Sequence, residues 1–232
     1  MSSRLASFRG PSTPTSSPAP HAPASPSRAS PSRQTESTIH RKTRTLLQEL
    51  RGIADTWDDL VLIDGLKAAR ELVDTRTELE NALKLLPDGK PKTHLVVPKL
   101  AIMDECITRL DAVLVKLQSQ FQRMNKIIDS LETVLIDAHK VKGWRWVHEE
   151  PLWMTWSLEN FVNRIPEILR PYHRSLAMHT ELADKLRKHN ISFEKSREII
   201  NKWVEQPCLE GVGWTDAWED ICEVEVERWS RS

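Results

Sequence analysis

Histidine and cysteine are the residues of this chain that could bind a metal or act as nucleophiles, but their spacing assembles no known site. The eight histidines are scattered, and none stands at a metal-ligand spacing from a cysteine or from another histidine. His173 and His179, for example, would not share one face of a helix as paired ligands should. Cys106, Cys208 and Cys222 are widely separated and form no CxxC pair. This pattern favours a reducing compartment and disfavours both a disulfide framework and a structural zinc site.

Motifs for catalysis are equally scarce. The seven glycines form no glycine-rich phosphate loop, and neither a Ser–His–Asp nor a Cys–His set stands in a recognisable motif. The acidic residues at 149–150 and from Asp216 to Glu227 are typical of solvated surface. We therefore expect a protein that is not an enzyme and that uses no cofactor and no metal. An enzyme with an unfamiliar site is an alternative, and it would need a polar pocket that the pattern does not predict.

Phosphorylation is the remaining chemistry that the sequence suggests, and it would fall in residues 1–37. This segment is built from Ser, Pro, Ala and Arg, which predicts a disordered tail. Two Ser-Pro pairs in it continue to arginine, at Ser25 and at Ser30, in the pattern that cyclin-dependent kinases prefer. Phosphate there would make the basic tail neutral or acidic. A tail of this composition also produces such short strings by chance, so Ser25 and Ser30 are candidate phosphosites only.

The elements that must position any site are helices. Between residues 98 and 141, apolar residues recur in steps of three and four, which is typical of a long helix packed along its length against other helices. They are Leu100, Met103, Ile107, Leu110, Leu114, Leu117, Phe121, Met124, Ile128, Leu131, Leu135 and Ala138. With Leu100 at heptad position a, most g positions are apolar as well. This widened seam favours a bundle of three or more helices, with the seam either inside one chain or offered to another.

A second helical pattern precedes this seam, from Leu46 through Trp57 to Leu86, with a slip of phase at Asp64-Gly65 that predicts a stutter or bend. Residues 87–91 (PDGKP) are a turn signal. Two helices of about 40 residues, each about 60 Å long, should therefore form an antiparallel hairpin over 38–142. We expect this hairpin to leave the apolar g flank of its second helix uncovered.

The region 143–232 contains eight of the nine tryptophans. It predicts a helix near Ser157, which Pro166 and Pro171 kink or delay, and another that Ser192 caps. On regular apolar faces Trp156 and Trp203, like Trp57 in the hairpin, should be core residues. For Trp214, Trp218 and Trp229, core packing and exposed anchoring remain open. The predicted fold is thus all-α: an elongated, coiled-coil-like antiparallel hairpin with a smaller Trp-rich helical part and a disordered N-terminal tail.

Charge and hydropathy disfavour further classes of function. The 33 basic residues balance the 33 acidic ones, so no electrostatic footprint for direct binding of nucleic acid is expected. No apolar run approaches the roughly 18 residues of a membrane span, and the first ten residues lack the apolar stretch of a secretory signal. The prolines of the tail also disfavour the amphipathic helix of a mitochondrial presequence.

Three short blocks stand out along the chain: residues 54–62 (ADTWDDLVL), residues 151–156 (PLWMTW) and residues 203–207 (WVEQP). In their order and spacing, and together with apolar residues between them, they resemble the cyclin-dependent-kinase-interacting protein (CINP) family, with this chain as a divergent, fungal-type member. The likeness covers most of residues 50–210. The residues that carry it are Trp57, Leu152, Trp153, Trp156, Phe161, Leu169, Tyr172, Trp203, Gln206 and Pro207.

The sequence departs from the family pattern in a few places. The first block has one extra residue after the Asp, and Pro166 and Pro171 interrupt a helix that the family carries unbroken. The Ser/Pro-rich tail and the acidic, Trp-rich end have no counterpart in the family, so nothing transfers to them.

The resemblance implies a small, non-enzymatic adaptor of the nucleus and cytoplasm. The family is tied to cyclin-dependent kinase complexes, to replication and checkpoint signalling, and to AAA-type ATPases that, with a second small helical protein, serve late ribosome maturation. The block residues would then be packing or docking determinants, and a helical partner would bind along the 98–141 seam. The alternative is a structural coiled-coil subunit of another assembly, such as a kinetochore or spindle complex, which would share the seam but not the blocks.

Overall fold

In the computed structural model, the chain divides into two units, Met1–Thr35 and Glu36–Ser232. The structure describes residues 36–87, 91–210, 218 and 221, all of them in the second unit. The predicted disorder of the tail and the candidate phosphosites Ser25 and Ser30 lie outside the described residues, as do Trp214 and Trp229.

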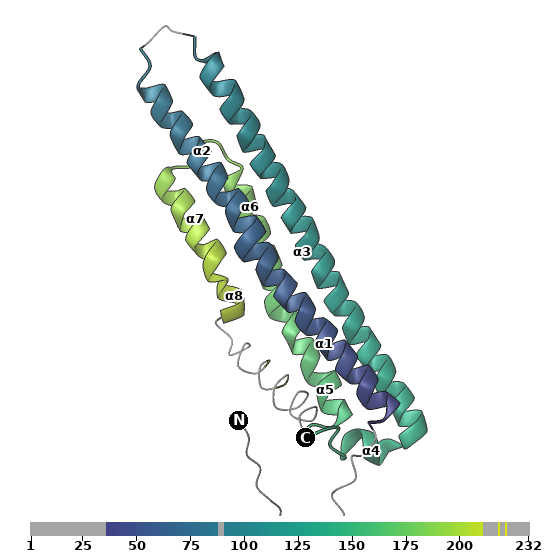
Figure 1. Ribbon diagram of the computed structural model, residues 1–232. Helices are drawn as coiled ribbons and strands as arrows, with labels where there is room; N and C mark the ends of the chain where they lie inside the picture. The colour runs from purple at the N-terminus through teal and green to yellow at the C-terminus, as the bar shows by residue number, and fades with distance from the viewer. Residues whose placement is uncertain (1–35, 88–90, 211–217, 219–220, 222–232) are drawn as a thin grey trace, which may run out of the picture. The chain divides into compact units, whose positions relative to one another are not determined.

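Two long helical segments form the hairpin (Figure 1). The first consists of α1 (Thr38–Asp59), a π-helix (Leu60–Gly65) and α2 (Leu66–Lys84), and the second is α3 (Thr93–Lys142). At 1.5 Å per residue, the 50 residues of α3 are about 75 Å long. The segments pack antiparallel, and Gly143 ends α3 with a positive φ of 84°. The predicted elongated, all-α hairpin is confirmed, and the π-helix occupies the predicted phase slip.

The C-terminal helices return along the hairpin as a second layer. They are α4 (Trp144–His148), α5 (Leu158–Arg164), a 3-10 helix (Ile165–Ile168), α6 (Leu169–Leu186), α7 (Phe193–Glu205) and α8 (Pro207–Glu210). Ser192 caps α7 as predicted, and the helix predicted near Ser157 is α5, with Ser157 as its N-cap. The two hydroxyl oxygens accept hydrogen bonds from the backbone N–H groups of Lys195 and Asn160 at 3.3 Å each. Pro166 lies in the 3-10 helix, and Pro171 lies in the first turn of α6. The two prolines therefore break the predicted helix into three pieces.

The buried stripe of α3 is shifted by one heptad position from the predicted seam. The d residues and the apolar g residues are buried, whereas most a residues are only partly buried and Leu100 is 37% exposed. The buried residues are Met103, Cys106, Leu110, Val113, Leu117, Met124, Ile127, Ile128, Leu131, Val134 and Ala138. The stripe is centred on the d positions because these lie between the g side and the a side of α3, and helices pack against both of these sides.

Ion pairs and ring contacts identify these two sides. At the c positions next to g, Arg109 pairs with Glu71 at 2.7 Å, and Arg123 and Lys116 likewise reach acids of the first hairpin segment. At the e and a positions, Asp111 pairs with Arg187 after α6, and the ring of Phe121 meets a histidine of α6. The expectation of an uncovered g flank was therefore wrong. The first segment covers the g side, and the a side is the one that meets α6.

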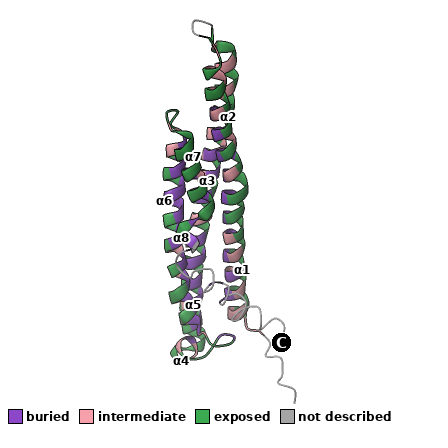
Figure 2. Ribbon diagram, turned by 90° about the vertical axis from the view of Figure 1, so that its left-hand side faces the viewer, coloured by how far each residue is buried: buried purple, intermediate pink, exposed green. Residues whose placement is uncertain are grey.

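The far end of the hairpin extends beyond this second layer, as Figures 1 and 2 show. We call residues 79–86 and 95–102 the hairpin tip. No described residue from 77 to 102 is buried, although Leu79, Leu83 and Leu86 continue the apolar pattern of α2. Among the described residues, no helix combines the length and the apolar character needed to cross a bilayer.

Candidate functional site: two aromatic clusters and a groove

The first aromatic cluster forms where α7 meets the π-helix of the hairpin. Trp203 of α7 is fully buried, and its indole Nε1–H donates to the carbonyl oxygen of Val61 at 3.0 Å. The same carbonyl accepts the N–H of Leu66, five residues further along the chain. A π turn widens the helix locally and changes the direction of its carbonyl groups. The phase slip of the first segment is therefore the place where α7 joins the hairpin.

Gly65 permits this close approach. A Cβ atom added to Gly65 would lie 2.7 Å from Cζ2 of Trp203 and 3.1 Å from the Leu60 carbonyl oxygen. The indole ring is rigid and enclosed, so it cannot move aside as a flexible side chain would. Glycine is required here by the neighbouring ring, because the backbone conformation of the π-helix itself suits any residue.

A buried histidine supports the same contact from α6. The ring of His179 lies edge-on to Trp203, with centroids 4.7 Å apart. Its Nδ1 is 2.8 Å from the Ser175 carbonyl oxygen, and its Nε2 is 3.4 Å from the Trp203 carbonyl oxygen. Burial lowers the pKa of His179, although the carbonyl oxygens of Ser175 and Trp203 act in the opposite direction. The imidazole is therefore neutral at neutral pH and serves to connect α6 with α7.

Gln206 ends α7 in the left-handed conformation, with φ 40° and ψ 51°, and is the only described non-glycine residue with positive φ. Its side-chain Nε2 donates to Oδ1 of Asp58 in α1 at 3.2 Å. Desolvation raises the pKa of Asp58, and the hydrogen bond from Gln206 opposes that shift. Pro207 then begins α8, as expected for a residue that cannot continue α7. The Gln-Pro pair thus stops α7 and ties its end to the hairpin.

Trp57 and Tyr172 extend this cluster to the facing side of α1. Their rings meet edge to face at a centroid distance of 5.0 Å, and both are buried. The T-shaped arrangement of two large rings adds to the area that they remove from water. The Nε1 of Trp57 is buried and has no hydrogen-bond partner among the described residues. Trp57 therefore contributes through packing.

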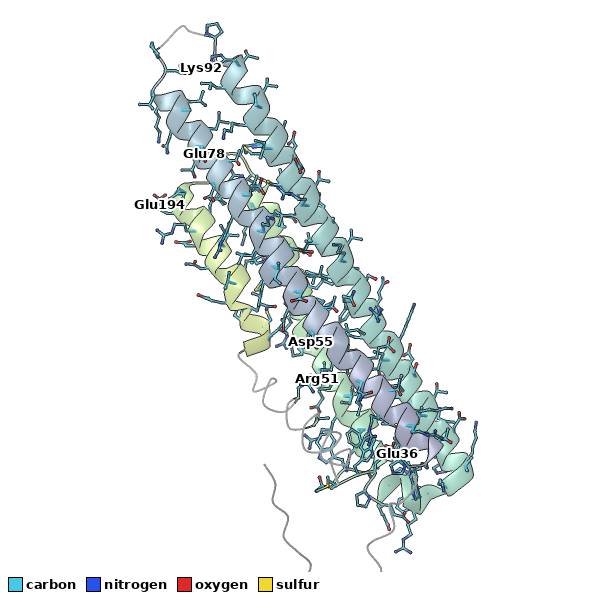
Figure 3. The ribbon with its side chains drawn as sticks, viewed as in Figure 1. Glu36, Arg51, Asp55, Glu78, Lys92 and Glu194 are labelled. Carbon is cyan, nitrogen blue, oxygen red and sulfur yellow. The ribbon has the colours of Figure 1, made fainter. Side chains whose placement is uncertain are left out.

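The second aromatic cluster lies at the foot of the hairpin, near the start of α1. The ring of Phe161 contacts those of Trp153 and Trp156, each at 5.3 Å between centroids. Arg44 of α1 lies over the Trp153 ring at 5.6 Å and forms a bidentate ion pair with Glu36, at 2.7 and 3.1 Å. Figure 3 labels Glu36 at this end of the bundle. This cluster attaches the loop after α4 to the first turns of α1.

Leu152 belongs to the same cluster. It is buried, and its N–H donates to the carbonyl oxygen of Trp156 at 2.7 Å, which closes the loop between α4 and α5. Trp156 is only partly buried, and the guanidinium of Arg164 lies over its ring at 5.9 Å. Trp156 is therefore the member of this cluster that is most accessible from outside.

A groove between α3 and α6 is the third feature. Phe121 and Leu169 provide its apolar lining, and the exposed side chains of Arg170, His173 and Arg174 stand around it. The rings of Phe121 and His173 are 5.5 Å apart. The partly buried a residues of α3 continue this apolar edge in both directions. The groove combines apolar contact with positive charge, a combination suited to an acidic amphipathic segment.

The block residues of the sequence analysis thus separate into two groups within the second unit. Trp57, Tyr172, Trp203, Gln206 and Pro207 gather at the π-helix, and Leu152, Trp153, Trp156 and Phe161 gather at the foot. Leu169 belongs to neither group and lines the groove. Most of these side chains are buried, so the structure gives them a packing role. Whether any of them also docks a partner stays a prediction.

Sequence reasoning did not identify several residues of these sites. Gly65 was noted only as a break in the pattern, and His179 only as one of the scattered histidines. Arg76 is 5% exposed, and its Nη2 donates to the Leu186 carbonyl oxygen at 2.6 Å, at the end of α6. Burial lowers the pKa of Arg76. The only signal for this residue was a basic side chain within an otherwise apolar stripe of α2.

In the described ranges, no three His, Cys, Asp or Glu side chains come together as metal ligands would. A comparison of the sequence with models of known protein families finds no match, and a search of curated proteins finds no match either.

Proposed function

We propose that this protein is a non-enzymatic adaptor or scaffold subunit of the kind that the cyclin-dependent-kinase-interacting protein family represents. It would bind a helical partner and connect it to an AAA-type ATPase complex or to a cyclin-dependent kinase assembly. Its processes would be replication and cell-cycle control or ribosome maturation, in the nucleus and cytoplasm. The basis for the family assignment is the ordered set of three blocks in the sequence.

The observation that carries the adaptor proposal is the groove between α3 and α6. It lies on the a side of the 98–141 seam, where the apolar residues of α3 remain partly exposed. An amphipathic helix could place its apolar face on Phe121 and Leu169 and its acidic residues beside Arg170 and Arg174. The helical partner predicted from the seam would then bind along this edge, because the g side is already covered by the chain itself.

The two aromatic clusters support the scaffold part of the proposal. They attach the C-terminal layer to the middle and to the foot of the hairpin, so the groove lies between elements that are held at both places. A binding groove on rigid elements loses little entropy when a partner binds. Substituting the buried tryptophans would damage the fold itself, so a test of binding must use the exposed residues of the groove.

The experiment is affinity purification of the tagged protein from its own cells, followed by mass spectrometry. A charge-reversed variant, Arg170→Glu with Arg174→Glu, is compared with Lys67→Glu with Arg70→Glu, which reverses two exposed charges on α2. We expect the wild type and the α2 variant to recover AAA-type ATPases and a second small helical protein, and the groove variant to lose them. Circular dichroism of both variants checks that the helices are intact.

Two results would contradict the proposal. Recovery of kinetochore or spindle subunits in place of ATPases and kinases would favour the alternative, a structural coiled-coil subunit, for which the long α3 is well suited. Equal recovery of partners by the groove variant and the α2 variant would show that the groove is not the binding surface.

A further inference from the structure

The hairpin tip exposes apolar side chains on both of its segments. Leu85 is 85% exposed, Val97 57% and Ile102 36%. No described residue from 77 to 102 is buried, and Figure 2 shows this end of the hairpin without buried residues. Single exposed hydrophobic residues are ordinary, but a contiguous group of them at the end of one element is typical of an interaction site.

The first turns of α3 are also apolar on every side. From Leu95 to Met103 the only polar residue is Lys99, which pairs with Glu78 of α2. A helix that is apolar all round normally has neighbours on all sides. Here α2 is the one helix that the described part of the chain places alongside, because α6 ends at the level of Arg76. The tip therefore lacks the helical neighbours that its residues require.

The charges around the tip are separated along its axis. Lys84 and Lys92 lie toward the far end, and Glu80 and Glu105 lie nearer to the body of the bundle. Lys99, which lies between Lys92 and Glu105, is paired with Glu78 of the same chain. Figure 3 shows Lys92 at the far end and Glu78 below it, at about the level where α7 begins. Along α3, Lys92 and Glu105 are separated by about 20 Å. Two tips that overlap antiparallel would place the basic end of each beside the acidic residues of the other.

We propose that a second copy of this chain occupies the hairpin tip, so that two hairpins pair tip to tip as a short antiparallel four-helix bundle. Each tip supplies the apolar neighbours that the other lacks, and the separated charges make the surface complementary to itself, as a two-fold interface requires. The apolar overlap is about eight residues per helix, or about 12 Å. Such a contact is smaller than a standard interface, so the dimer is weak and depends on concentration. This proposal does not depend on the adaptor function.

The first test measures the mass of the full chain in solution by sedimentation equilibrium across the micromolar range. We expect the wild type to shift from monomer to dimer as its concentration rises. Val97→Glu and Ile102→Glu should keep the chain monomeric, because each places a charge inside the overlap. The matched control is Val115→Glu, since Val115 is 70% exposed on the same helix but lies outside the tip. This control should dimerise like the wild type, and circular dichroism should show equal helix content for all chains.

A mixing experiment then tests the antiparallel pairing. One variant carries Lys84→Glu and Lys92→Glu, and the other carries Glu80→Lys and Glu105→Lys. Each variant alone should dimerise more weakly than the wild type, and an equimolar mixture should form a heterodimer. A wild type that stays monomeric to sub-millimolar concentration would overturn the proposal. So would dimerisation that Val115→Glu abolishes and Val97→Glu does not. Loss of another protein from the tip variants of a monomeric chain would also overturn it, because the occupant would then be that protein.

Discussion

At the level of the π-helix the hairpin is enclosed by the second layer, whereas at its tip α2 and α3 have no further neighbour among the described residues. Trp203 and Trp57 are fully buried in the enclosed region, and at the tip even Leu83 is only partly buried. Yet the apolar pattern of α2, interrupted by Arg76, runs from one region into the other. The reach of the second layer decides the difference, because α6 ends at the level of Arg76, whereas both segments of the hairpin continue beyond that level.

Apolar residues at equivalent positions of the helical pattern therefore contribute unequally to the free energy of unfolding. A leucine gains the full benefit of burial only where a third helix excludes water from it. The enclosed region should therefore determine the global stability of the unit, and the tip should open locally at much lower free energy. Four substitution experiments test this contrast.

Trp203→Ala should have the largest effect. Removing a fully buried indole leaves a large cavity between α7 and the π-helix and removes the hydrogen bond to Val61, so we expect a loss of about 3–5 kcal/mol in the free energy of unfolding. Urea denaturation monitored by circular dichroism measures it. Trp203→Phe should lose clearly less, because the ring remains and mainly the hydrogen bond, worth about 1 kcal/mol, disappears. A loss below about 1 kcal/mol for Trp203→Ala would mean that α7 contributes little to the fold.

Leucine truncation compares the two regions directly. Leu110→Ala, at a fully buried d position, should cost about 2–5 kcal/mol, whereas Leu83→Ala at the tip should cost about 1 kcal/mol or less. Denaturation is measured at low protein concentration, where association of the tips is negligible. Hydrogen exchange should also be faster in residues 79–86 and 95–102 than around Leu110. Equal costs for the two leucines would contradict the contrast.

Gly65→Ala should cost about 1–3 kcal/mol, because the new methyl group would meet the Trp203 ring at 2.7 Å. Gly52→Ala is the matched control on the same helical segment, since a Cβ there meets nothing within 4 Å. This control should stabilise the protein by up to about 1 kcal/mol through helix propensity. If both substitutions stabilised the protein, the close approach of Trp203 to the π-helix would be refuted.

The smallest effect concerns pH. His179 is neutral in the folded state because burial lowers its pKa, and it binds a proton below about pH 6.5 once the chain is unfolded. The unfolded state then holds more protons, so stability should fall as the pH decreases below about 6.5. His179→Gln should reduce this slope in denaturation curves at several pH values. It should not abolish the slope, because partial burial also lowers the pKa of His40. His189→Gln, at an exposed position, is the matched control for the substitution of a histidine.

Local features of the sequence predicted the helix boundaries well. Ser157, Ser192 and Gly143 act within one turn of their own position, through side-chain hydrogen bonds or a backbone conformation that neighbours do not need to impose. The prolines at 166 and 171 likewise act locally, because a proline has no backbone N–H to donate and its ring clashes with the preceding turn of a helix. The antiparallel hairpin followed from two long apolar patterns and a short turn.

The candidate sites could be predicted only in part. Trp57, Trp156 and Trp203 were expected in the core; Trp57 and Trp203 are buried, whereas Trp156 is only partly buried. Their partners could not be foreseen, because Trp203 meets Val61 and Gly65 across more than 130 residues of chain, and no local pattern encodes such a pairing. The groove has the same origin, since it joins α3 and α6, which are remote in sequence. His179 connects two consecutive helices, but its contact with Trp203 depends on how α6 and α7 pack, which the sequence pattern does not specify.

The sequence alone therefore specified the helices, their ends, the hairpin and the position of its irregularity, because these depend on residues within a few turns of one another. Tertiary packing decided which side of α3 is buried most deeply, which residue packs against the π-helix and where the second layer ends. These outcomes depend on where along the bundle axis helices from distant parts of the sequence meet. A heptad pattern is the same at every position along that axis, so it does not encode these meeting points. For this reason the apolar residues of the enclosed middle and of the open tip look alike in the sequence and differ only in the folded protein.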